Sequence, residues 1–116
     1  MSAIPSLNVL IFSDGDLTVA QCLEYDIAVQ ARTWLDAISA FKLAIIEQVQ
    51  LDIEVGKQPL SDTPAAPHMY TEKFNDEHAV PIDAQTVQEA PIGSPDELVA
   101  RLFRDLKSKM YVGCPA

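Results

Sequence analysis

Two carboxylates in the first third of the chain have a spacing that could bind a cation. Glu24 and Asp26 lie two positions apart in a segment predicted to be extended, so their side chains could point the same way. A solvated strand end is the more ordinary interpretation of two such carboxylates. The sequence therefore predicts no metal site here.

The two histidines offer a second arrangement of possible metal ligands. His68 and His78 lie in a proline-rich stretch with several acids nearby, which are Glu72, Asp76 and Glu77. Imidazole and carboxylate groups could coordinate a metal loosely. Chance placement is the favoured interpretation, so no metal and no cofactor is expected.

The nucleophilic side chains have no partners in the sequence that would activate them. Cys22 has no evident base beside it and is expected to pack on a strand, whereas Cys114 is expected to be exposed. The two cysteines form no CxxC motif, which argues against a zinc site or a disulfide framework and favours a reduced, cytoplasmic protein. Ser13 and Ser94 suit a turn and a helix cap, and the four glycines make no phosphate-binding cluster. The sequence predicts that the protein is not an enzyme.

The elements that position these side chains begin with a hairpin. Residues 7–12 are almost entirely apolar and end at an Asp-Gly pair, whose residues tolerate the positive φ of a tight turn. A return strand over residues 17–24 and a short third strand over residues 26–31 should follow.

A long helix comes next, predicted over residues 34–55. Thr33 is its expected N-cap and Gly56 its end. At 100° per residue one apolar stripe forms, which should cover the sheet and consists of Trp34, Ile38, Phe41, Ile45 and Val49. Leu35, Ile46 and Ile53 flank this stripe and Leu43 stands on the polar face, so these four residues are candidates for a partner or subunit contact.

The second half of the chain divides into a connector and a last helix. Residues 57–93 are proline-rich and acidic, with one helical turn expected at residues 68–74, where Tyr70 and Phe74 would anchor the connector to the core. A capping sequence at Ser94 to Glu97 predicts an amphipathic helix that runs through Met110. The predicted organisation is a core over residues 1–56, a connector over 57–93, and a C-terminal helix and tail over 94–116.

Composition limits the functions that the chain can have. A chain of 116 residues with 48% hydrophobic residues supports one folded core, and its net charge of −9 opposes binding to phosphate backbones. The first residues contain no basic region before a short apolar stretch, so neither a signal peptide nor a membrane helix is expected.

The first half of the chain resembles the HicB-like antitoxin family. The resemblance covers residues 7–55 and is most specific over residues 19–27, VAQCLEYDI, followed by Thr33 and Ala37 at the helix start. It implies an α+β fold in which a three-stranded antiparallel sheet (β-β-β-α), related to part of a ribonuclease H fold, is covered by one long helix. It also implies binding of a small basic toxin-like protein. Family members usually carry a DNA-binding domain, for which the C-terminal residues 94–116 are too short.

The expected function is therefore a non-catalytic, antitoxin-type or regulatory protein-binding module without direct DNA binding. Self-association as a homodimer or higher oligomer is also expected, because one helix on three strands leaves the other sheet face and the edges uncovered. The alternatives are a divergent ribonuclease H-related nucleic-acid-processing enzyme and a small-molecule-binding or structural module.

Overall fold

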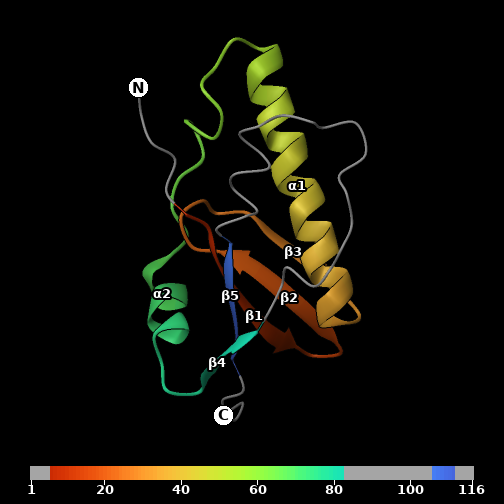
Figure 1. Cartoon of the computed structure of the whole chain (residues 1–116), viewed down its shortest axis with the longest axis vertical. Helices are drawn as coiled ribbons and strands as arrows, with labels where there is room; N and C mark the ends of the chain where they lie inside the picture. The colour runs from red at the N-terminus through yellow and green to blue at the C-terminus, as the bar shows by residue number, and fades with distance from the viewer. Residues whose placement is uncertain (1–5, 83–105, 112–116) are drawn as a thin grey trace.

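The computed structural model describes residues 6–82 and 106–111, which form an α+β fold (Figure 1). In chain order the elements are β1 (Asn8–Asp14), β2 (Leu17–Cys22), β3 (Ala28–Ala31), α1 (Trp34–Glu54), α2 (His68–Phe74), β4 (Ala79–Ile82) and β5 (Lys107–Tyr111).

The first three strands form the predicted antiparallel meander. Gly15 has a φ of 63° in the β1–β2 turn, where the Asp-Gly pair predicted a hairpin. The hairpin pairs Val9 with Cys22, and β2 in turn pairs with β3. The predicted N-cap of α1 is also confirmed, since the Thr33 side chain accepts a hydrogen bond of 3.1 Å from the Asp36 backbone N–H.

The expectation of a three-stranded antiparallel sheet is wrong. The sheet has five strands in the order β3-β2-β1-β5-β4, and it is mixed because β5 runs parallel to β1. β1 is therefore a central strand rather than an edge. Its Val9, Leu10 and Ile11 are fully buried, as is usual for a strand covered on both faces.

The prediction that a C-terminal helix runs through Met110 is also wrong for its last residues, because Lys107–Tyr111 is strand β5. Residues along β5 alternate between the two sheet faces. Ser108 is buried and Met110 packs against the core under α1, whereas Tyr111 packs on the opposite side. Residues 83–105, which include the predicted start of that helix, lie outside the described residues.

Two elements occupy the described part of the predicted connector. The expected helical turn at residues 68–74 is confirmed as α2. Strand β4 was not predicted, and it contains Pro81. Proline is tolerated there because β4 is the last strand in the sheet order and pairs only with β5 among the described strands.

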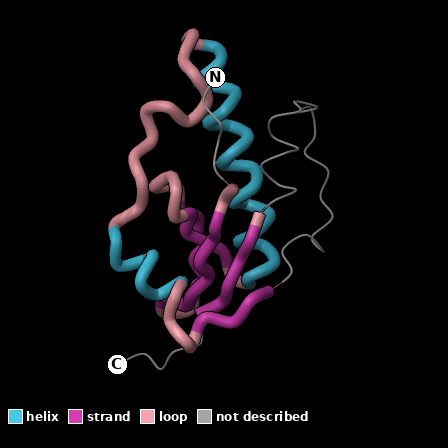
Figure 2. Tube along the Cα trace, turned by 60° about the vertical axis from the view of Figure 1, so that its left-hand side comes forward, coloured by secondary structure: helices cyan, strands magenta, loops and turns pink. Residues whose placement is uncertain are grey.

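The two helices lie on opposite sides of the sheet (Figure 2). α1 packs over β2 and β3, and its Phe41 and Ile45 meet the small side chains Ala20 and Cys22. On the other side Phe74 of α2 packs against Leu10 and Leu23. The uncovered second face that the sequence predicted is thus partly covered by the chain itself.

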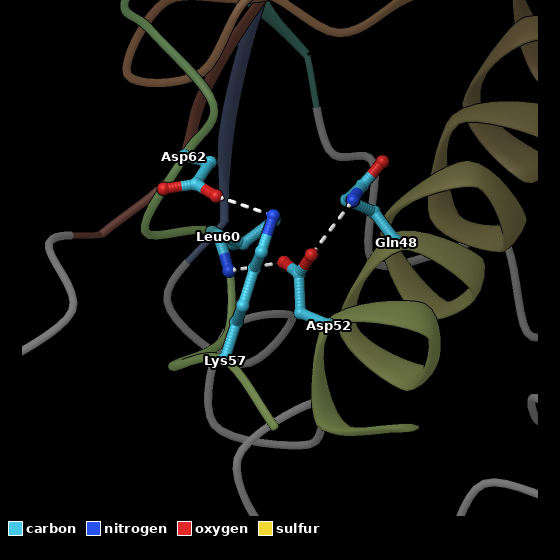
Figure 3. Close-up of polar contacts among 5 residues, drawn as sticks. All are labelled: Gln48, Asp52, Lys57, Leu60 and Asp62. Atoms are coloured by element: carbon cyan, nitrogen blue, oxygen red, sulfur yellow. Dashed lines mark hydrogen bonds and ion pairs between the residues drawn. The ribbon is translucent and has the colours of Figure 1, made fainter. Parts of the chain in front are cut away.

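The chain after α1 turns back and is held at the end of the core by a buried carboxylate (Figure 3). Asp52 is 5% exposed and accepts hydrogen bonds from the Leu60 backbone N–H at 2.7 Å and from Gln48 Nε2 at 3.0 Å. Leu60 is buried in the core under α1 and has a φ of 64°, a rare conformation for a branched side chain. We call these two residues the Asp52–Leu60 latch.

No helix among the described residues is long and apolar enough to cross a membrane.

Candidate functional site

Glu24 and Asp26, the two carboxylates considered as cation ligands, both accept hydrogen bonds from neighbouring amide groups. Glu24 accepts hydrogen bonds from the backbone N–H and from the side-chain Nδ2 of Asn8, each at 2.7 Å. Asp26 accepts one from Nε2 of Gln21 at 3.1 Å. Glu24 therefore joins the end of β2 to the start of β1, while Asp26 closes the β2–β3 turn.

The two histidines pair with carboxylates of their own segments. His68 lies 3.9 Å from Glu72 on α2, and Nδ1 of His78 lies 2.7 Å from Oδ1 of Asp76. Hydrogen bonds from the backbone and the ring of His78 lower the pKa of Asp76. Within residues 6–82 and 106–111, no three histidine, cysteine or acidic side chains are grouped so that they could hold a metal ion.

Cys22 is a packed core residue in the structure. Its side chain is fully buried, and this burial raises the pKa of the thiol to about 12. A thiol with so high a pKa is protonated at neutral pH and is a weak nucleophile. Of the other residues considered, Ser13 is exposed beside the hairpin turn, whereas Ser94 and Cys114 lie outside the described residues.

Three of the four residues predicted as a contact are exposed, and the fourth is not. Leu35, Leu43 and Ile53 are 46%, 52% and 50% exposed, whereas Ile46 is only 5% exposed and belongs to the core under α1. Ile46 therefore has little side-chain surface to offer a partner.

Leu43 stands within an acidic surface on the outer side of α1. The exposed residues spaced around it at helical intervals form a surface that we call the acidic stripe, which consists of Asp36, Leu43, Glu47, Gln50 and Glu54. Leu35, Leu51 and Ile53 add exposed aliphatic side chains beside it. The stripe thus presents carboxylates together with apolar surface.

On the other side of the sheet, aromatic and lysine side chains attach α2 to the strands. Tyr70 stacks on Phe12 of β1 with ring centroids 5.8 Å apart, and Lys73 lies 5.5 Å from the Phe12 ring. Lys109 of β5 lies 4.7 Å from the ring of Phe74 and donates a hydrogen bond of 3.2 Å to its carbonyl. The sequence indicated Tyr70 and Phe74 as anchors through their i,i+4 spacing, but it gave no signal for Lys109, which meets Phe74 from β5.

A groove of about 440 Å³ lies on this same side, next to α2. α2 packs mainly on β1 and β5. The groove is lined by Phe12, Asp14, Val19, Gln21, Ala28, Val29, Gln30 and Tyr70. Sequence analysis missed it because these residues come together from three strands and a distant helix.

Gln21 gives this groove a fixed polar group. It is 3% exposed, and its Nε2 donates to the Cys22 carbonyl at 2.9 Å and to Asp26 Oδ1 at 3.1 Å. These two bonds use both amide hydrogens. The Oε1 atom of Gln21 is then an acceptor that no hydrogen bond from the described residues occupies.

Comparisons with protein-family models, with curated proteins and with solved structures found no match.

Proposed function

We propose that this chain is a non-catalytic, antitoxin-type protein-binding module that engages a small basic protein through the outer side of α1. The resemblance of residues 7–55 to HicB-like antitoxins supports this class of function. So does the observed order of three antiparallel strands followed by a long helix.

The observation that carries the proposal is the acidic stripe. Leu43 is 52% exposed, and Glu47 lies one helical turn from it, with Asp36 and Glu54 further along the same side of α1. Leu35 and Ile53 extend the apolar surface. Buried apolar area gives an interface most of its stability, whereas complementary charge speeds association and selects the partner. A protein that presents basic and apolar side chains together fits this surface.

The state of the nucleophilic and acidic groups favours binding over catalysis. Cys22 is buried with a raised pKa, and Glu24 is engaged through both oxygens. Ribonuclease H chemistry requires several carboxylates that converge on two metal ions. Glu24 and Asp26 instead have separate structural partners.

The test is titration of the purified chain with the product of an adjacent open reading frame that encodes a short basic protein. We expect a stable complex by isothermal titration calorimetry. Leu43→Glu should weaken it by about tenfold or more, because a charge would enter the apolar centre of the contact. Met69→Glu is the matched control, since Met69 is 51% exposed but lies on α2, on the opposite side of the sheet.

Three results would contradict the proposal. They are the absence of a complex with such a protein, equal weakening by Leu43→Glu and Met69→Glu, and a metal-dependent nuclease activity that Asp26→Asn abolishes. The last result would favour the enzyme alternative.

A further inference from the structure

Strand β3 ends the sheet with backbone groups directed outward. It pairs with β2 and is the last strand in the sheet order. The Cys22 N–H donates to the Ile27 carbonyl at 3.0 Å, so this carbonyl is directed at β2. Because this direction alternates along an antiparallel strand, Ala28 and Gln30 direct their backbone groups away from β2, to an edge that no described strand covers. An extended segment could pair with these groups as an additional strand.

The groove described above lies beside this edge. Its floor includes Gln21, Ala28 and Gln30, and Tyr70 stands beside them from α2. A strand added to β3 would lie about 4.8 Å away, and every second side chain would point to the groove side of the sheet. There it would face the groove that Gln21, Tyr70 and Phe12 line.

Charge selects the kind of segment that fits this edge. Residues 6–32 carry four carboxylates and a single basic side chain, Arg32, and Asp14 itself lines the groove. A lysine or arginine side chain that extends into the groove from this edge would be attracted by the Asp14 carboxylate and by the aromatic rings that line the groove.

We infer that β3 accepts an extended basic segment of a partner protein as a sixth strand, with a lysine or arginine side chain of that segment directed into the groove that Asp14 and Tyr70 line. This inference rests on the proposed protein-binding function and specifies a second contact for the same class of partner. A second copy of this chain fits less well. Its own β3, Ala28–Ala31, has no basic side chain, and pairing two copies would bring their carboxylates together.

A matched pair of substitutions at residue 30 tests strand addition. Gln30→Pro removes the outward N–H and places a ring at the edge, while the groups that pair with β2 belong to its neighbours. Gln30→Ala changes the side chain but keeps the N–H. The probe is a fluorescein-labelled peptide of about ten residues that alternates lysine and valine, and its binding is followed by fluorescence anisotropy.

We expect the lysine peptide to bind the wild-type chain and an otherwise identical glutamate peptide not to bind. Gln30→Pro should weaken binding by about tenfold or more, and Gln30→Ala by less than about twofold. A lysine peptide that is N-methylated at alternate amides should also bind at least about tenfold more weakly to the wild type. This last measurement keeps the test valid if Gln30→Pro fails to fold.

Other results would overturn the inference. Equal binding of the N-methylated peptide, or equal binding to folded Gln30→Pro, would mean attraction by charge alone. Binding lost in Leu43→Glu and kept in Gln30→Pro would place the peptide on α1, which would leave the proposed function intact. Absence of peptide binding would reject the strand contact, while the proposed function is decided by the titration with the partner protein. Light scattering that shows a dimer of the wild type and a monomer of Gln30→Pro, without peptide binding, would assign the edge to a second copy.

Discussion

At the scale of single residues, Asp52 shows how one buried carboxylate can fix a change of chain direction. It lies near the end of α1, and its two oxygens receive hydrogens from Gln48 and from the backbone of Leu60. The second bond holds Leu60 at a φ of 64° with its side chain in the core. A backbone conformation of this kind persists only where surrounding contacts stabilise it.

Loss of the Asp52–Leu60 latch should destabilise the fold more than loss of the neighbouring ion pair. Asp52→Ala leaves the buried Leu60 N–H without a partner, which costs about 1–3 kcal/mol. Lys57→Ala removes an exposed pair with Asp62 and should have little effect on stability, because solvent screens the attraction between the two charges. Asp52→Asn keeps an acceptor and should fall between the two. Urea unfolding measures all three variants, and equal midpoints for Asp52→Ala and Lys57→Ala would refute the role of the latch.

Burial of Cys22 makes the stability of the protein depend on pH in the alkaline range. Its pKa rises from 9.0 in the unfolded chain to about 12 in the fold, so the folded state retains a proton that the unfolded state loses. The stability that comes from this shift is complete below pH 9 and is lost as the pH rises toward 12. In a Cys114→Ser background, the stability advantage over Cys22→Ala should shrink as the pH rises from 9 toward about 12 in urea unfolding. An advantage that stays constant would contradict this assignment.

At the scale of elements, α1 has two sides with separate roles. Its apolar stripe packs on the sheet through Ile38, Phe41 and Ile45, which are fully buried. The acidic stripe on its outer side carries the proposed function. On β2, the small side chains of Ala20 and Cys22 belong to the same core cluster as the buried residues of the apolar stripe.

The inner side of α1 should tolerate truncation poorly and the outer side well. Ile45→Ala removes a fully buried side chain and should cost about 2–5 kcal/mol through lost transfer energy and an unfilled cavity. Leu43→Ala, at a position 52% exposed, should stay within about 0.5 kcal/mol of the wild type. Thermal or urea unfolding of both variants would show this contrast. A midpoint of Ile45→Ala equal to that of the wild type would mean that the inner side of the helix is assigned wrongly.

At the scale of the whole molecule, the presence of a helix on each face of the sheet weakens the argument for self-association. That expectation depended on an uncovered sheet face, which α2 partly covers by packing against β1 and β5. The features that still favour self-association are the β3 edge and the exposed side chains of α1. Light scattering of the wild type and of Gln30→Pro therefore measures the oligomeric state and the use of the edge together.

The whole chain should show no appreciable affinity for duplex DNA at physiological salt. Its net charge is −9, and Lys73 and Lys109 are engaged with aromatic rings. Phosphate contacts need clustered lysine and arginine side chains that can replace counterions. Anisotropy of a labelled duplex over a range of salt concentrations checks this expectation. Tight binding that weakens steeply with salt would show that a local basic surface outweighs the net charge.

The sequence by itself determined the elements that depend on neighbouring residues. The turn at Gly15, the cap at Thr33, the buried stripe of α1 and the short helix with Tyr70 and Phe74 follow from turn chemistry, capping and periodicity. Each of these signals acts over a few residues, so the surrounding fold did not have to be known.

Only the tertiary structure decided which segments complete the sheet and which side chains meet at its surfaces. Residues 107–111 fit the end of an amphipathic helix when taken alone. In the fold they pair with β1, on the side of that strand that β2 does not occupy. The groove and the Asp52–Leu60 latch likewise join residues from separate elements. Contacts of this kind arise when distant segments share one core. Local propensity cannot determine them, because the free-energy differences between residues in helix or strand propensity are smaller than the free energy of packing and strand pairing.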